Sequence, residues 1–161
     1  MGVLKFQIVV ILFFSVNVFA DQLVSCNDGD TCRIKTSDGI VKVRLAGIDA
    51  PETGQSGWEA SRDYLVKKLK DQDLKLECNG KSYDRKVCRI FVNSTDINGE
   101  MINAGMAWDY PQYSEKRYIK FEVSARQKKL GLWAGSALKS PFCYRHETAS
   151  GCSKNKNQFQ P

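Results

Sequence analysis

Two acidic stretches of the sequence combine residue types and a spacing that could do chemistry. The first is NDGDTC at residues 27–32, and the second, about twenty residues later, is RLAGIDAPET at residues 44–53. The first stretch reads as a hairpin turn, and a strand meander would return the chain to the same end, so Asp30 and Asp49 are expected to meet in space. Carboxylates, backbone carbonyls and water together suit Ca²⁺, although two carboxylates give only modest affinity. The two stretches therefore predict an oxygen-only metal site.

Glu52 and Arg44 lie on either side of the second aspartate in the sequence. Glu52, which Pro51 restrains, could orient or deprotonate a metal-bound water. Arg44, on the polar face of its strand, could hold a phosphate oxygen through two hydrogen bonds and stabilise charge in a transition state. Taken singly, these features have simpler interpretations: DGDT as a turn, residues 49–52 as a capping loop, and Arg44 as a solvated strand residue. Their joint occurrence at this spacing favours a reaction site.

Several common catalytic designs are missing from the sequence. His146 is the only histidine, so paired-histidine mechanisms, histidine-bearing triads and His-rich metal centres are poorly supported. No P-loop and no GxSxG motif occurs. Acid and base catalysis must therefore come from carboxylates, and positive charge from arginine, lysine or a bound cation.

The first twenty residues have the composition of a secretory signal peptide. Lys5 is their only charge, an apolar run extends to Phe19, and the small Ala20 suits cleavage before Asp21. A permanent anchor is the alternative, but the apolar run is interrupted and short for a membrane span. No later stretch is apolar enough to cross a membrane, so the mature chain is expected to be secreted or periplasmic and free of the membrane. The net charge of +6 favours polyanionic partners.

All six cysteines follow the predicted signal peptide, as expected for disulfides in an oxidising compartment. Six cysteines allow fifteen pairings. Sequence order favours three local pairs, which are Cys26 with Cys32, Cys78 with Cys88, and Cys143 with Cys152. A structural zinc site is the alternative, but the sequence has no C-x2-C pair and a single histidine.

Strand and helix patterns alternate along the rest of the chain. Residues 23–48 read as three short antiparallel strands, and residues 74–78 and 87–92 alternate again and complete a set of five. A capping-box signature at Ser56 and Glu59 starts the first helical pattern. The expected helices cover residues 57–70, 99–104 and 115–130.

The order of these elements predicts the fold. Three strands, a helix, two strands and two helices fit a mainly β, α+β domain built on a five-stranded Greek-key barrel, the OB-fold, with about three helices. The domain is expected to cover residues 21–139, after a signal peptide at residues 1–20. The polar tail, residues 140–161, is expected to be held only by its cysteine pair.

With the motifs in place, the sequence resembles the thermonuclease, or staphylococcal-nuclease-like, family. The matching stretches are DGDTCRI, VRLAGIDAPET, YDRKVCRIFV, INGEMINAGMAWDY and LGLW, which together extend over residues 23–133. The combination of RLAGIDAPE with an upstream DGDT is highly specific. The resemblance implies that Asp30 and Asp49 ligate Ca²⁺ through their side chains, with the Ala50 carbonyl as a further ligand. Asp28 would support the metal site without contacting the ion.

The resemblance also implies the reaction. Glu52 would be the general base or the carboxylate that positions the water, while Arg44 and Arg85 would clamp the scissile phosphate. Such domains cleave DNA and RNA with little sequence preference, break the bond to the 5′ oxygen and leave 3′-phosphate ends.

Aromatic and basic residues could hold the substrate. The family places tyrosines that correspond to Tyr110 and Tyr113 against a nucleotide, and Tyr83, close to the second arginine, is a further candidate. Trp108 is explained as readily by the core. Four lysines could steer the phosphate backbone or could simply form a solvated face: Lys81, Lys86, Lys116 and Lys120.

Two features depart from the family pattern. Asp84 replaces the usual glycine before Arg85, where it could pair with this arginine and weaken its grip on phosphate, and Arg89 is the alternative second arginine. The cysteines and the tail do not belong to the usual core, so they are interpreted as stabilisers.

Two other functions compete with a nuclease. One is a nucleic-acid-binding module that kept the barrel and lost catalysis, and the other is a structural domain stabilised by Ca²⁺. The retained set of Arg44, Asp49, Glu52 and Arg85 favours the nuclease, because a pure binder has no reason to keep it. A monomer is the default expectation.

Overall fold

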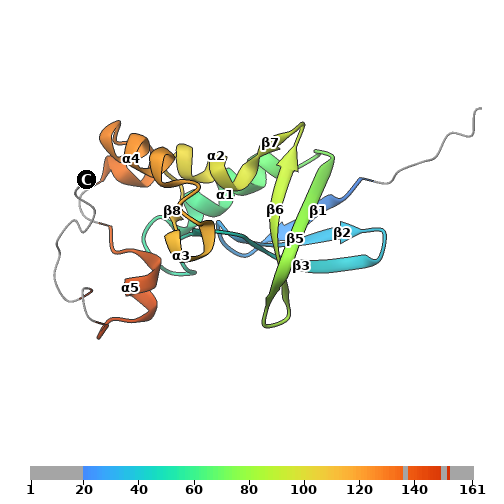
Figure 1. The fold of residues 1–161 in the computed structure, drawn as a ribbon, viewed down its shortest axis with the longest axis horizontal. Coiled ribbons are helices and arrows are strands. Elements are labelled where there is room, and N and C mark those ends of the chain that lie inside the picture. Colours follow the sequence, from blue (N-terminus) through green and yellow to red (C-terminus); the bar gives the residue numbers. More distant parts are fainter. Residues whose placement is uncertain (1–19, 136–137, 150–151, 153–161) are drawn as a thin grey trace, which may run out of the picture.

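The computed structural model describes residues 20–135, 138–149 and 152. Figure 1 shows long twisted strands at one end of the molecule and most of the helices beside and beyond them. The predicted signal peptide lies, apart from Ala20, outside the described residues. Among the residues described, no helix is both long and apolar enough to cross a membrane.

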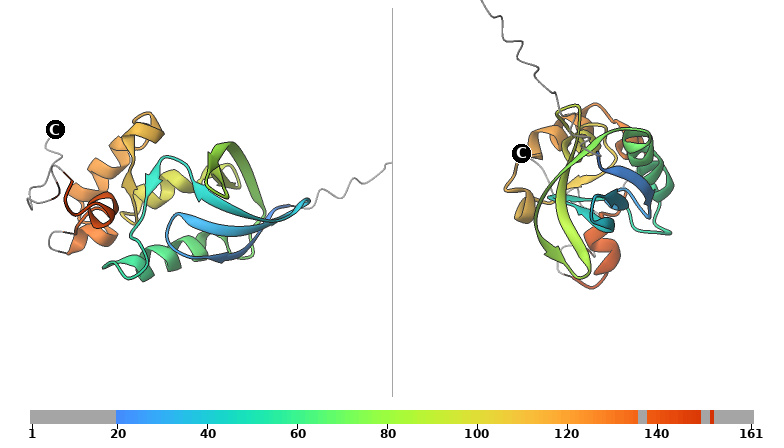
Figure 2. Two further views of the ribbon diagram at one scale, coloured as in Figure 1. Left: turned by 90° about the horizontal axis from the view of Figure 1, so that it is seen from below. Right: turned by 90° about the vertical axis from the view of Figure 1, so that its right-hand side faces the viewer.

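Five long strands form the main sheet, as many as the sequence predicts. In sheet order they are β1 (Gln22–Cys26), β2 (Thr31–Thr36), β3 (Gly39–Leu45), β6 (Arg85–Val92) and β5 (Leu74–Ser82). Neighbouring strands are antiparallel except β3 and β6, which run parallel. The Leu74 N–H donates to the Asp21 carbonyl at 2.9 Å in a bridge that brings β5 to the start of β1. Figure 2 shows the strands curving around a common interior, so the predicted OB-like α+β fold is confirmed.

Three very short strands extend this framework. β4 (Ile48–Asp49) pairs antiparallel with β8 (Trp108–Asp109), which sets Asp49 opposite Trp108, and β7 (Thr95–Asp96) pairs with β6. The sequence did not predict these strands, because two residues are too few to show an alternating pattern.

The helices follow the predicted order with three short additions. They are α1 (Trp58–Leu69), α2 (Ile97–Asn103), α3 (Pro111–Ser114), α4 (Ile119–Gln127), the 3₁₀-helix η1 (Gly131–Ala134) and α5 (Pro141–Arg145). The additions are α3, η1 and α5. α1 and α2 lie within two residues of the predicted bounds. The predicted capping box is wrong, because α1 begins after Gly57, whose φ is 85°, and no side chain caps it.

The long helix predicted over residues 115–130 is shorter in the structure. Glu115 and Lys116 have φ angles of 54° and 62°, which a right-handed helix excludes, so α4 begins only at Ile119. The separate helix α3 precedes this turn and has Pro111 in its first turn, where a missing N–H costs nothing.

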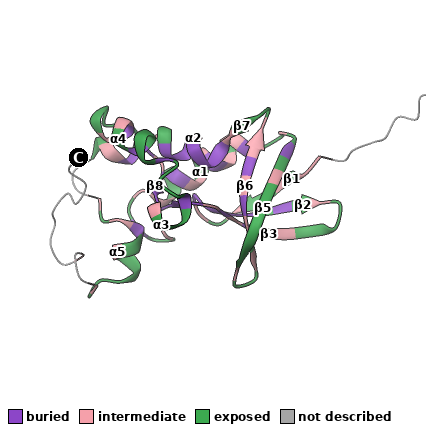
Figure 3. Cartoon of the chain, viewed as in Figure 1, coloured by how far each residue is buried: buried purple, intermediate pink, exposed green. Residues whose placement is uncertain are grey.

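The core lies between the strands and the helices α1 and α2. Ile34, Val43, Leu45 and Ile90 alternate with exposed or half-buried residues along their strands and are each at most 1% exposed. Figure 3 shows buried residues concentrated where α2 meets the strands, whereas the tips of the β2–β3 and β5–β6 hairpins are exposed. The alternation seen in the sequence therefore reflects strands that bury one face.

Asn98 is a buried polar residue that links α2 to the barrel. Its Oδ1 accepts from the Ile90 N–H at 3.1 Å, and its Nδ2 donates to the carbonyls of Ala46 and Cys88 at 2.9 and 3.2 Å. Asn98 thereby fixes the end of β3, from which the chain passes to Asp49.

Asn98→Ala is expected to destabilise the protein by about 3 kcal/mol, because it leaves buried backbone groups without partners. Urea denaturation of the oxidised protein measures this change, with the exposed Asn79→Ala as a control that should stay within about 0.5 kcal/mol of the wild type. Equal stability of the two variants would mean that Asn98 is replaceable in the core.

Three disulfides join the six cysteines in the local pairs that the sequence favours. Cys26–Cys32 links β1 to β2, Cys78–Cys88 links β5 to β6, and Cys143–Cys152 closes the tail around α5. The first two therefore cross-link strands that are already paired.

Candidate active site

The turn between β1 and β2 places the first acidic cluster. Asp28 accepts the N–H of Asp30 through Oδ1 at 3.0 Å, which holds the turn in shape. Between them, a Cβ on Gly29 would lie 1.8 Å from the Ser61 hydroxyl oxygen, so only glycine fits where the turn meets α1. The spacing of the two carboxylates is therefore fixed by packing against a helix.

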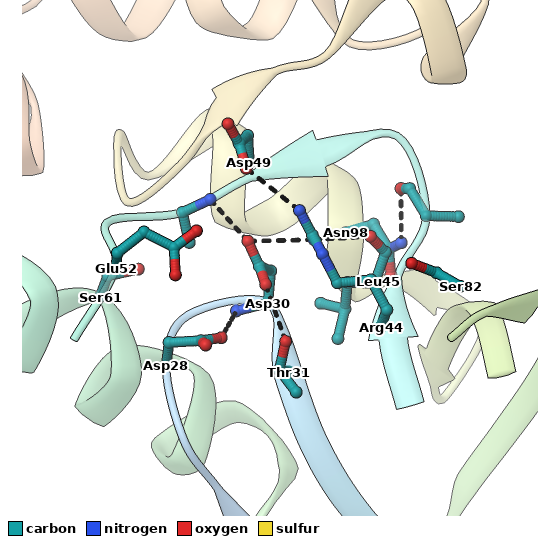
Figure 4. Close-up of polar contacts among 12 residues, drawn as sticks. Asp28, Asp30, Thr31, Arg44, Leu45, Asp49, Glu52, Ser61, Ser82 and Asn98 are labelled. Atoms are coloured by element: carbon teal, nitrogen blue, oxygen red, sulfur yellow. Dashed lines mark hydrogen bonds and ion pairs between the residues drawn. The ribbon is translucent and has the colours of Figure 1, made fainter. Parts of the chain in front are cut away.

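Asp30 and Asp49 lie close together, as the meander predicted (Figure 4). Arg44 lies between them, with Nη1 3.0 Å from Asp30 Oδ2 and Nη2 3.1 Å from Asp49 Oδ1. The same Asp30 Oδ2 accepts the Ala50 N–H at 2.7 Å. The two aspartates are only 5% and 3% exposed, so one arginine neutralises part of a buried pair of like charges.

Burial dominates the electrostatics of the acidic cluster. It raises the pKa of the Asp28 carboxyl to about 7, and the negative charge of Asp30 adds to this increase. Burial also raises the pKa of Asp49, while hydrogen bonds and charge from Arg145 and Arg44 oppose the increase. The cluster therefore favours cationic neighbours.

The donor chemistry of this cluster fits a hard cation. Asp30 and Asp49 offer carboxylate oxygens side by side, and Ca²⁺ takes such oxygens together with carbonyls and water. In the described part of the chain, no group of three or more acidic, histidine or cysteine side chains is arranged to hold a metal. A cation here would rely on two carboxylates, in agreement with the modest affinity expected from the sequence.

Glu52 is less buried than the aspartates and faces the same site (Figure 4). Its backbone N–H donates to Gln55 Oε1 at 3.1 Å, which holds the loop after β4. Its carboxylate forms an ion pair with Arg145, a residue of the tail helix α5. Arg145 also contacts both oxygens of Asp49, at 3.1 and 2.9 Å.

Arg145 was not predicted as a site residue, because the tail was expected to be held only by its disulfide. The structure corrects this: α5 begins with a Ser140 hydroxyl that accepts the Cys143 N–H, followed by Pro141. A serine cap followed by proline is a helix-start signal that was present in the sequence. Its contact with residues nearly a hundred positions earlier had no local signal.

Arg85 reaches the site from β6. Its guanidinium lies 3.4 Å from the hydroxyl of Thr31, the residue that follows Asp30 in the chain, and 3.2 Å from the Ser82 hydroxyl. Asp84 pairs with Lys42 on β3, so the expected weakening of Arg85 by Asp84 has no contact to support it. The alternative arginine, Arg89, is instead paired with Asp96 at 2.7 Å.

A wide cleft of about 1100 Å³ connects these groups. Its lining includes Asp28, Asp30, Arg44, Glu52, Arg85 and Arg145, together with Lys81 and the three predicted tyrosines, Tyr83, Tyr110 and Tyr113. Trp108 is 6% exposed and belongs to the interior.

The tyrosines differ in their setting. Tyr83 is 94% exposed and Tyr113 is 64% exposed, whereas Tyr110 is half-buried and packs edge-on against Tyr113 with ring centres 4.7 Å apart. The exposed faces of Tyr83 and Tyr113 are available for stacking.

Comparison with known proteins agrees with this arrangement. Residues 42–135 match the family model described as staphylococcal nuclease homologue. An uncharacterised endonuclease of Haemophilus influenzae is 36% identical over 130 residues, covering 78% of this chain and 72% of the relative. A micrococcal nuclease of Shigella flexneri is 31% identical over 152 residues, covering 84% and 87%. The staphylococcal-like nuclease CAN1 of Arabidopsis thaliana is 34% identical over 112 residues, covering 68% of this chain and 35% of that longer protein.

The matched region contains Arg44, Glu52 and Arg85, which line the cleft, and Asp49, which is bound to Arg44. The family model covers more than half of the chain, and the two bacterial relatives are matched over most of their length. The chain therefore belongs to the family of staphylococcal nuclease homologues.

Proposed function

We propose that this chain is a secreted or periplasmic nuclease that uses Ca²⁺ to hydrolyse DNA and RNA with little sequence preference. The observation that supports it best is the buried pair of Asp30 and Asp49, bound by Arg44 at the edge of a wide cleft. Arg44 neutralises only part of the negative charge of these two carboxylates, so the arrangement suits a metal ion that contacts carboxylate and phosphate together.

Asp30 and Asp49 would hold the Ca²⁺ ion, with the Ala50 carbonyl and water as further ligands. The bound ion would supply Lewis-acid stabilisation of the phosphoryl oxygens. Asp28 would support the site through the hydrogen bond that it accepts from the Asp30 backbone.

The remaining side chains would carry the reaction. Glu52 would accept a proton from the water that attacks phosphorus, while Arg44 and Arg85 would hold the phosphoryl oxygens as negative charge develops. The bond to the 5′ oxygen would break, which leaves a 3′-phosphate end. Arginine suits this role because its planar guanidinium offers two parallel hydrogen bonds.

Substrate binding would use the aromatic and basic lining of the cleft. Tyr113, Tyr110 and Tyr83 would contact bases or sugars without regard to sequence, since every base has a face on which to stack. Lys81, which lines the same cleft, would attract the phosphate backbone.

The proposed location depends on the first twenty residues and on the cysteines. A cleaved signal peptide would release a chain that begins at Asp21, and three disulfides suit an oxidising compartment. We expect this chain to act as a monomer, without a membrane anchor after cleavage.

Incubation of the oxidised mature chain with plasmid DNA and with single-stranded RNA tests the proposal. Both polymers are expected to be degraded in Ca²⁺ and to survive in excess chelator, because removal of the ion would remove its stabilisation of the phosphoryl oxygens. A parallel reaction in Mg²⁺ measures metal preference, and end-labelled products measure the position of cleavage.

Binding of intact DNA under every metal condition would contradict the enzymatic proposal and favour the nucleic-acid-binding module. A rise in melting temperature with Ca²⁺, without binding or cleavage of DNA, would favour the structural domain.

A further inference from the structure

The tail segment that contains α5 is attached to the active-site loop by contacts from both of its ends. Before the helix, the Lys139 carbonyl accepts from Gln55 Nε2 at 2.7 Å, and Gln55 itself is buried next to Glu52 in the loop. The Cys143–Cys152 disulfide then closes the helix onto the following turn. The tail is thus fixed at the loop that follows Asp49.

This attachment places the guanidinium of Arg145 against the carboxylates of Asp49 and Glu52. Arg145 Nη1 and Nη2 contact Asp49 Oδ1 and Oδ2 at 3.1 and 2.9 Å, and Nη1 also contacts Glu52 Oε1. Within the described part of the chain, no other side chain forms a hydrogen bond or an ion pair with the Glu52 carboxylate. Arg145 therefore forms a bridge from the buried metal-ligand candidate Asp49 to the more exposed Glu52.

A glutamate at this position needs such a restraint. Glu52 is half-buried and its side chain has three rotatable bonds, so without a partner its carboxylate would sample many positions. Displacement of a reacting group by about 1 Å can cost about a hundredfold in rate. A planar guanidinium held on both oxygens of Asp49 has a fixed orientation, and its Nη1, which also contacts Glu52, holds the glutamate beside it.

We propose that Arg145 is a positioning residue, which holds the Glu52 carboxylate beside Asp49, so that the tail helix completes the active site. The inference rests on the proposed function of Glu52 as the base. It assigns a catalytic contribution to the tail, which lies outside the matched family region.

Steady-state kinetics of Arg145→Gln at saturating Ca²⁺ provide the test. kcat is expected to fall by about ten- to a hundredfold while KM for DNA stays within about threefold, because the side chain acts through Glu52. Arg145→Lys should recover only part of the loss, since one ammonium cannot bridge both acids. Lys139→Gln is the matched control: it keeps the backbone carbonyl that accepts from Gln55 and removes only an exposed tail ion pair with Glu147, so it should leave kcat unchanged.

Chemical rescue separates positioning from a merely structural role. Ethylguanidinium added to Arg145→Ala should restore part of kcat, because the lost group is a guanidinium beside an open cleft. Melting curves of all variants in chelator should agree with the wild type within a few degrees. A variant with the fold intact and no rescue would overturn the inference.

Calorimetric titration with Ca²⁺ tests the alternative role of the Arg145–Asp49 contact, in which Arg145 competes with the cation for Asp49. Binding within about tenfold of the wild type, together with reduced kcat, supports positioning. Higher kcat combined with much tighter Ca²⁺ binding would overturn it and show instead that Arg145 competes with the cation for Asp49. Failure of the proposed function is distinguishable, because the wild-type chain itself would then not cleave DNA.

Discussion

The Glu52→Gln variant is expected to hydrolyse DNA at least about a hundredfold more slowly than the wild type at saturating Ca²⁺. The amide has the shape of the carboxylate and can still accept a hydrogen bond from Arg145, so the tail contact survives. It cannot take a proton from the attacking water, so only the basic function is removed. Initial rates on end-labelled DNA, with Ca²⁺ varied to establish saturation, measure the effect.

The matched control for this variant is Glu147→Gln, at an exposed glutamate on the same tail. It should leave the rate unchanged, because its only described partner is Lys139. A Glu52→Gln rate within about threefold of the wild type would remove Glu52 from the mechanism and leave water activation to the metal alone.

Arg44→Lys is expected to reduce kcat by on the order of a hundred- to a thousandfold, the effect of losing a preorganised donor to a developing negative charge. The guanidinium reaches Asp30 through one nitrogen and Asp49 through the other. An ammonium is a single point charge and cannot reproduce this span while also facing a phosphate. Single-turnover kinetics separate the chemical step from binding.

The same variant should also be less stable in chelator than the wild type, because two buried aspartates lose much of their compensation. Ca²⁺ should reduce this difference in melting temperature, since the ion would supply positive charge to the same carboxylates. Arg33→Lys, at an exposed position on β2, is the control. Unchanged kcat in Arg44→Lys would show that a simple positive charge is sufficient at this position.

The long strands could be predicted because each buries one face. Alternation places Val43 and Leu45 inward and predicts β3 almost completely, whereas β4 and β8 are too short to alternate. The start of α4 was placed too early, because Glu115 and Lys116 are compatible with a helix by composition and adopt positive φ only in their tertiary context.

The site was predictable to the extent that its residues are close in sequence. Asp30 and Asp49 follow from a meander, and their neighbours Arg44 and Glu52 share the same short segment. Arg145 comes from a polar tail without periodicity, and its partners lie far away along the chain. Sequence pattern indicates local structure, while such a contact depends on how a short helix docks after the barrel has formed.

The disulfides of this chain are local, whereas the contacts that close the ring of strands are distant in sequence. The three disulfides close loops of only 6, 10 and 9 residues in sequence separation, whereas the parallel pairing of β3 with β6 and the Asp21–Leu74 bridge join distant segments. Local loops close quickly and distant ones slowly. Oxidation can therefore finish within separate local segments before the ring of strands closes, so late closure, and not disulfide reshuffling, should limit the rate of folding.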